Sequence, residues 1–162
     1  MAYCGKNFGK SKKSINKNST VSANVTKIGG KKIDLRKNFK VYVAAYQMIN
    51  GKKQVLAKTI IGHVVGRKNT KYTNAKKIKL SKSVYTLETG KTAKISAKTV
   101  LVSSRKKQLT NAHEPEFRYA STDESVATVN GSGIIKGVGT GICTVYVYSR
   151  NGYAKKVSVT VK

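Results

Sequence analysis

Hydrophobic and polar residues alternate with a period of two along most of the chain, and helical periodicity is hard to find. Such alternation is typical of strands that bury one face of a sheet. In the first part of the chain it predicts strands over residues 19–28, 38–49 and 54–65. The last two are joined by Asn50-Gly51, a pair that favours a two-residue type I′ turn, so we expect a hairpin there.

Residues 66–76 are polar, basic and without pattern, as expected of a linker between modules. The region after it predicts many short strands, which indicates a sandwich or a barrel. These strands are expected at 77–81, 83–88, 91–102, 117–122, 125–130, 133–138, 141–150 and 153–162. Asn130-Gly131 and Asn151-Gly152 predict two more two-residue hairpin turns, and Gly137 to Gly141 a further turn.

Composition supports an all-β fold and adds a strong positive charge. Val, Ile, Thr and Tyr are abundant, and these residues suit a pleated, half-buried surface. The chain has 33 Lys and Arg against 6 Asp and Glu, a net charge of +27. This charge favours polyanionic partners, among them nucleic acid, anionic membranes, teichoic acids and acidic glycans, without choosing between them.

The glycines between 131 and 141 invite comparison with a phosphate-binding loop. They match neither the P-loop nor the dinucleotide spacing, and the residues that follow predict a strand rather than the helix that such loops need. We therefore interpret them as turn residues. Period-two alternation places one set of side chains in the core of this region: Leu87, Ile95, Phe117 or Tyr119, Val126, Val129, Ile135, Cys143, Val145, Val147 and Val159.

The remaining reactive residues form no recognisable chemical site. Adjacent carboxylates such as Asp123 and Glu124 lack the further oxygen donors that calcium requires, and the two histidines, His63 and His113, have no nucleophile or acid nearby in sequence. Cys4 and Cys143 are too far apart for a metal motif, and we expect free thiols, with a bridge between them as the alternative. The sequence thus predicts no catalytic, metal or cofactor site, no cofactor, and no enzyme.

Lysine clusters fall largely at the expected turns. We predict an anion-contacting surface that consists of Lys52, Lys53, Arg105, Lys106, Lys107, Lys155 and Lys156. Solvated turns that protect sheet edges are the simpler explanation of the same residues. Nucleic-acid binding through this charge is the alternative function, although the five arginines are scattered singly and Tyr42, Tyr46, Tyr146 and Tyr148 are of a kind common on exposed sheet faces.

Residues 77–162 resemble the bacterial immunoglobulin-like domain of group 2. The segments "LETGKTAKISA" and "STDESVATVNGSGIIKGVGTG", together with the final "VTV", match that family's motifs. The matching residues are Leu87, Gly90, Thr92, Ile95, Ala97, Ser121, Asp123, Ser125, Val126, Ala127, Thr128, Val129, Gly133, Gly137, Val138, Gly141, Val159, Thr160 and Val161. The family's tryptophan before the Ser-Asp segment is replaced here by Tyr119 or Phe117, and the loop at 103–116 is longer than the family's minimum.

Residues 1–66 resemble, more weakly, the C-terminal strands of a fibronectin type III module. The matching residues are Phe39, Val41, Val43, Ala45, Tyr46, Asn50 and Gly51. The front strands of such a module are missing, so the exposed sheet is expected to seek a partner, including a second copy of the chain. The resemblances imply an all-β protein with a partial fibronectin type III-like module at 1–66, a linker at 67–76 and an immunoglobulin-like β-sandwich at 77–162.

Both families imply a non-catalytic structural or adhesion module of a bacterial cell-surface or secreted protein. Its expected partners are anionic wall polymer, glycan or a host surface protein, and we expect no membrane span. We expect no signal peptide within this sequence, and the chain is expected to be a fragment of a longer extracellular protein. An isopeptide link, known from some surface domains, is not expected with so few acids.

Overall fold

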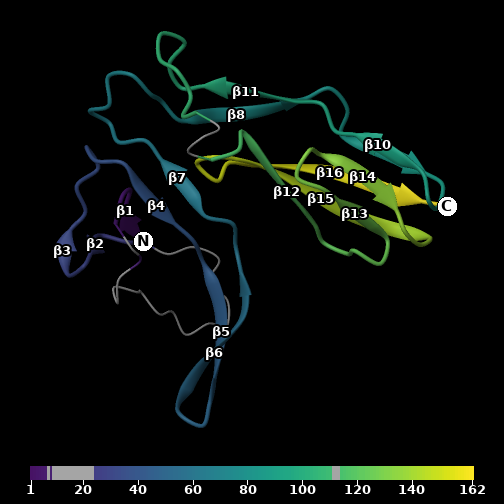
Figure 1. Cartoon of the computed structure of the whole chain (residues 1–162), viewed down its shortest axis with the longest axis horizontal. Helices are drawn as coiled ribbons and strands as arrows, with labels where there is room; N and C mark the ends of the chain where they lie inside the picture. Colours follow the sequence, from purple (N-terminus) through teal and green to yellow (C-terminus); the bar gives the residue numbers. More distant parts are fainter. Residues whose placement is uncertain (7, 9–23, 111–113) are drawn as a thin grey trace. The chain divides into compact units, whose positions relative to one another are not determined.

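The computed structural model describes residues 1–6, 8, 24–110 and 114–162, and these contain strands and turns but no helix. The predicted all-β class is therefore confirmed. The chain divides into two compact units, Met1–Thr70 and Lys71–Lys162, which are here called the first and second unit. Figure 1 shows the first unit in purple to blue and the second in teal to yellow.

In the first unit the described strands are short. They are Ala2–Tyr3 (β1), Lys27–Ile28 (β2), Lys31–Lys32 (β3), Phe39–Val41 (β4), Ala44–Ile49 (β5), Lys52–Lys58 (β6) and Gly62–Val64 (β7). They form a three-stranded sheet in the order β1-β4-β7 and two separate hairpins, β2-β3 and β5-β6. Among the described hydrophobic residues of this unit, only Ala2 and Val65 are buried. The first unit therefore has a very small core.

The hairpin predicted around Asn50-Gly51 is confirmed. Both residues have positive φ angles, 49° and 71°, as a type I′ turn requires, and Ile49 pairs with Lys52 across the turn. The strand expected at 38–49 is divided into β4 and β5, and the strand expected at 54–65 into β6 and β7. β4 and β7 pair in one sheet, and β5 and β6 pair in another. Of the strand expected at 19–28, only residues 24–28 are described, and β2 covers its end.

Asp34 holds a turn of the first unit together with Arg36. One carboxylate oxygen accepts hydrogen bonds from the Arg36 backbone N–H at 3.0 Å and from Nε at 2.8 Å, and the other accepts one from Nη2 at 3.1 Å. These bonds stabilise the charged carboxylate and lower the pKa of Asp34 to about 2. Because this pKa is depressed by folding, its contribution to stability is present above the unfolded pKa and is lost as the pH falls towards 2.

The titration of Asp34 tests this pair directly. In the native chain we expect an NMR titration midpoint of about 2 for its carboxyl carbon. In the variant Arg36→Ala it should rise towards the ordinary aspartate value of about 4. Asp123, whose pKa is lowered by hydrogen bonds from Ser125 instead, serves as the control and should titrate unchanged. An Asp34 midpoint unaffected by the substitution would contradict the assignment.

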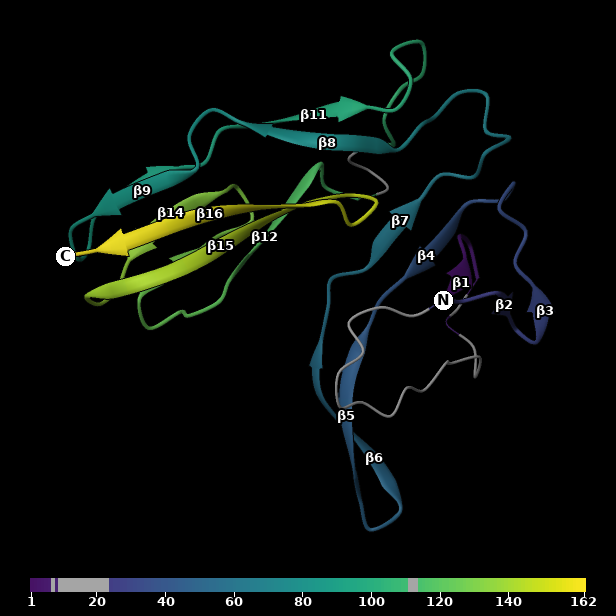
Figure 2. The ribbon, with the colours of Figure 1, turned by 180° about the vertical axis from the view of Figure 1, so that it is seen from behind.

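The second unit contains nine described strands that form a β-sandwich. They are Ala75–Leu80 (β8), Val84–Leu87 (β9), Thr92–Lys94 (β10), Ala97–Leu101 (β11), Phe117–Ser121 (β12), Ala127–Val129 (β13), Ile134–Gly137 (β14), Gly141–Ser149 (β15) and Ala154–Val161 (β16). One layer has the order β12-β15-β16-β9, with β9 parallel to β16 (Figure 2). The other contains β10-β14-β13, and β8 pairs with β11.

Part of the segment expected as a linker pairs with the second unit. The Lys107 N–H donates to the Lys71 carbonyl, and the Thr73 N–H donates to the Lys107 carbonyl, at 3.0 and 2.9 Å. Ala75, at the start of β8, is buried. Residues from Lys71 onwards thus belong to this unit.

The core of the second unit follows the alternation of its strands. Cys143, Val145 and Val147 of β15 point inward and are buried, while the residues between them face outward. The predicted core residues are all in or against this core, and Phe117 and Tyr119 both pack against it half-buried. Five further residues that were not predicted are also buried there: Ile78, Tyr85, Ala127, Val157 and Val161.

Two of the expected Asn-Gly turns have a different form from the prediction. At Asn130-Gly131 and Asn151-Gly152 only the later glycines Gly133 and Gly152 have positive φ, 75° and 83°. The Gly133 N–H donates to the Asn130 carbonyl, and the Gly152 N–H to the Ser149 carbonyl. Both are therefore three-residue loops in which a left-handed glycine follows a turn, and the prediction of two-residue turns was wrong.

Residues 137–141 connect the two layers rather than closing a hairpin as expected. β14 pairs in one sheet and β15 in the other. The N–H groups of Val138 and Gly139 both donate to the Val126 carbonyl, which holds the crossing segment against the sandwich. A Cβ atom on Gly137 would lie 2.7 Å from the Glu88 carbonyl oxygen, so the close approach of two backbone segments requires glycine here.

Candidate functional site

Two tyrosines form an aromatic surface on the outer face of the sheet β12-β15-β16. Tyr146 and Tyr148 are two residues apart on β15, so they project on the same side, opposite to the buried Val145 and Val147. Their rings are stacked with centroids 5.8 Å apart and planes inclined by 22°. The buried neighbours fix the register of the strand, and the tyrosine pair therefore lies on a rigid support.

Lys156 places a positive charge beside this pair. It is paired with Tyr146 across β15 and β16, and its Nζ lies 5.9 Å from the centroid of the Tyr146 ring. On the other side of Tyr146, β12 contributes the small side chain of Ala120. We call Tyr146, Tyr148 and Lys156 the tyrosine face.

The Tyr148 hydroxyl of the tyrosine face is neutral near pH 7. Burial raises the pKa of Tyr148, and the neighbouring Tyr146 raises it further. A neutral phenol both donates and accepts hydrogen bonds. The face thus combines two aromatic rings, two hydroxyls and one ammonium group, which suits a ligand with apolar C–H faces, hydroxyls and negative charge.

Arg118 is paired with Tyr148 but its guanidinium is used within the protein. Nη2 donates to the carbonyls of Ser149 and Arg150 at 2.9 and 3.1 Å, and Nη1 donates to a Glu114 carboxylate oxygen at 3.2 Å. The Arg150 Nε in turn donates to the Glu114 backbone carbonyl at 2.6 Å. These groups tie the segment before β12 to the turn between β15 and β16. We call Glu114, Arg118 and Arg150 the arginine cluster.

The seven basic residues predicted as an anion-contacting surface are divided between the two units. Lys52 and Lys53 are in β6 of the first unit, whereas the other five belong to the second unit. Lys155 pairs with the inward-facing Val147 and Lys156 with the outward-facing Tyr146, so these adjacent lysines project to opposite sides of the sheet. Of the seven, Lys156 is the residue that belongs to the tyrosine face.

Arg105, Lys106 and Lys107 follow β11 in the long polar loop. Arg105 and Lys107 are exposed and Lys106 is half-buried. The backbone of Lys107 is anchored to residues 71–73, as described above, and this anchoring positions its side chain at the surface. These three residues form a cationic region separate from the tyrosine face, and none of the three is aromatic.

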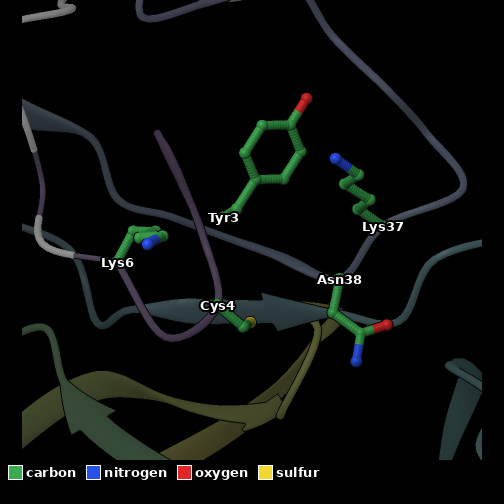
Figure 3. Close-up of a pocket in the computed structure, with 5 residues that line it drawn as sticks. All are labelled: Tyr3, Cys4, Lys6, Lys37 and Asn38. Atoms are coloured by element: carbon green, nitrogen blue, oxygen red, sulfur yellow. The ribbon is translucent and has the colours of Figure 1, made fainter.

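An open hollow of about 490 Å³ in the first unit is lined by Tyr3, Cys4, Lys6, Lys37 and Asn38 (Figure 3). Burial raises the pKa of the Cys4 thiol, an effect that the positive charge of Lys40 opposes. A raised pKa keeps the thiol protonated and makes it a poor nucleophile. Cys4 and Cys143 are both free thiols, in agreement with the preferred prediction, and Cys143 is buried in the core of the second unit.

The acidic residues with hydrogen bonds in the structure stabilise turns. Asp123 accepts hydrogen bonds from the backbone N–H and the hydroxyl of Ser125, at 3.0 and 2.6 Å, and Glu114 belongs to the arginine cluster. In the described part of the chain, no three or more His, Cys, Asp or Glu residues come together as metal ligands would. His63 lies in β7, paired with Lys40, and His113 lies outside the described residues.

The two packed, mainly antiparallel layers and the buried alternating valines of the second unit define an immunoglobulin-like β-sandwich. Residues 74–161 match the family model of the bacterial Ig-like domain (group 2), which is more than half of the chain. The chain therefore belongs to the bacterial Ig-like domain (group 2) family, as its central motif predicted. The fibronectin type III resemblance of the first unit stays a prediction.

Among solved structures, the chain is similar to one described as the crystal structure of the S-layer protein SbsC domains 4 and 5. The two share 15% sequence identity with a TM-score of 0.45, over 76% of this chain and 75% of that one. No curated protein matches the sequence significantly. Across the described residues, no helix is long and apolar enough to cross a membrane.

Proposed function

We propose that this chain is a non-catalytic structural and adhesion module of a bacterial cell-surface or secreted protein. In this proposal it contacts anionic wall polymer or host glycan through the tyrosine face of its second unit. Membership of the bacterial Ig-like family supports a structural role for the fold. The observation that carries the choice of ligand is the stacked pair Tyr146 and Tyr148 beside Lys156 on one rigid sheet.

The chemistry of the tyrosine face favours an anionic polysaccharide. The C–H faces of sugar rings pack against aromatic rings, and sugar hydroxyls bond to phenol groups. A phosphate or carboxylate on the polymer pairs with Lys156 and is attracted by the net charge of +27. Since the rings are held in place by the sheet, little side-chain freedom is lost on binding.

A non-catalytic role agrees with how three of the six acidic groups are used. The carboxylates of Asp34, Glu114 and Asp123 each bond to residues of the same turn or cluster. A general acid or base needs a carboxylate that can reach a substrate. We therefore assign these three carboxylates a structural role.

The proposal is tested with a panel of teichoic acid, neutral and acidic glycans, and single- and double-stranded DNA, each at two salt concentrations. The double variant Tyr146→Ala/Tyr148→Ala should bind the preferred anionic polysaccharide about thirtyfold more weakly, since each of the two rings contributes on the order of 1 kcal/mol. Tyr153→Ala is the matched control, because Tyr153 is 47% exposed in the loop after β15 and lies outside the tyrosine face. Its affinity should be unchanged.

Two results would contradict the proposal. One is equal binding by the double variant and the native chain, with thermal unfolding confirming that both are folded. The other is binding to DNA alone that persists at moderate salt, since attraction by net charge only weakens steeply as salt rises. The second result would support nucleic-acid binding instead.

A further inference from the structure

The hairpin β5-β6 of the first unit exposes several large apolar side chains. Within the described residues its two strands pair only with each other, and all seven residues of β6 are exposed. Met48, Val55 and Leu56 are 56%, 59% and 59% exposed. A two-stranded hairpin is marginally stable by itself, and large apolar side chains exposed together mark an interaction surface.

Each face of this hairpin combines apolar and cationic side chains. Tyr46 pairs with Val55 and Met48 with Lys53, so these four share one face, where the Lys53 Nζ lies 4.2 Å from the Tyr46 ring centroid. The next pair, Ile49 and Lys52, belongs to the opposite face. Residues 44–58 contain three lysines and no acidic residue.

This charge distinguishes between possible partners of the hairpin. Lysines on an edge strand oppose pairing with another copy of the same edge, because like charges then face each other. A second copy of this chain also brings a net charge of +27, which adds to the repulsion. A strand that carries acidic residues in alternate positions meets the same lysines with opposite charge.

We propose that the β5-β6 hairpin binds an acidic, extended segment of a partner protein, which adds to its edge as a further strand. Backbone hydrogen bonds along the edge supply affinity, and the alternating apolar and lysine side chains select a partner that alternates apolar and acidic residues. This site lies in the first unit and takes a polypeptide, so it is distinct from the tyrosine face and its polysaccharide.

The full chain is titrated with a ten-residue peptide that alternates valine and glutamate. Two further peptides act as probes: one with lysine in place of glutamate, and one in which two central valines are proline, which cannot supply edge hydrogen bonds. We expect the acidic peptide to bind at least about tenfold more tightly than either analogue. Its binding should slow hydrogen exchange at backbone amides of β5 or β6.

A pair of variants tests the residues involved. Lys52→Glu/Lys53→Glu should weaken binding of the acidic peptide by about tenfold, since it reverses two charges beside the peptide. The matched control is Lys31→Glu/Lys32→Glu, because these lysines follow the turn of the other hairpin in the same unit and are also exposed. The control should bind as the native chain does.

Three results would overturn the proposal. The proline analogue binds as tightly as the acidic peptide, the control variant loses as much affinity as the hairpin variant, or the chain without peptide forms a dimer that protects the hairpin amides. The last result would assign the hairpin to self-association. Each of these three results is independent of the polysaccharide assays, because those assays test binding at the tyrosine face.

Discussion

Replacing Ile135 with alanine is expected to lower the free energy of unfolding of the second unit by about 3 kcal/mol. Ile135 has 0% exposure and lies in β14, the central strand of its layer, where it is paired with Ala93 on one side and Val129 on the other. The substitution removes buried methyl and methylene groups and leaves a cavity between two layers. The small side chain of Ala93 cannot fill that space.

Chemical denaturation followed by circular dichroism measures this loss. Ile134→Ala is the matched control, because Ile134 is the preceding residue on the same strand and is 38% exposed on the other face. Its effect should be markedly smaller, within about 1 kcal/mol. Equal losses for the two variants would contradict the inward and outward assignment of β14 and with it the sandwich.

Removal of the Arg118 guanidinium is the second large expected effect. The variant Arg118→Met should lose about 2 to 3 kcal/mol of stability, because the carbonyls of Ser149 and Arg150 and the carboxylate of Glu114 would each lose a donor. The side chains of Arg118 and Glu114 are only 13% and 22% exposed, so water replaces the lost bonds poorly. Methionine retains most of the apolar packing of the arginine stem.

Urea denaturation of three variants separates the charge from the geometry. Arg118→Lys should recover only part of the loss, since one ammonium group cannot bond both carbonyls and the carboxylate in the planar arrangement of a guanidinium. Arg105→Met, at an exposed loop position, is the control and should be nearly neutral. Native stability in Arg118→Met would show that the arginine cluster does not hold this end of the sandwich.

The sequence predicted the sandwich well because its strands have one buried face. In β15 the alternation of Cys143, Val145 and Val147 with polar or tyrosine residues is unambiguous, and the observed burial follows it. Turn geometry was less predictable. Asn-Gly is compatible with several loops, and at Asn130 the side chain accepts hydrogen bonds from the N–H groups of Ser132 and Ile134, which favours the longer loop.

The candidate site was predicted only in part. Lysine clusters suggested one anion-contacting surface, but adjacent lysines on a strand project to opposite faces, as Lys155 and Lys156 do. Applying the period of two to these lysines would have separated them. The tyrosines at 146 and 148 were recognised as outward residues, yet the sequence could not show how closely their rings stack.

The arginine cluster could not be predicted from the sequence. Glu114 and Arg150 are 36 residues apart and meet only because β12 and β15 are neighbours in the sheet. The sequence contains one indication of the cluster: Arg118 is a charged residue within the strand segment "FRYAS", and a charged side chain that is buried in a sheet needs a partner. The sequence does not indicate which acceptor groups the Arg118 guanidinium bonds to.

Mapping a bound polymer by NMR will show whether the tyrosine face is the binding surface, as proposed. Teichoic acid is titrated into the ¹⁵N-labelled full chain at moderate salt, and amide shift changes are followed for each residue. If this surface binds the polymer, the largest changes are expected at Tyr146, Tyr148 and Lys156. Changes of equal size at Lys52, Lys53 and the loop Arg105–Lys107, with none centred on the tyrosines, would contradict it.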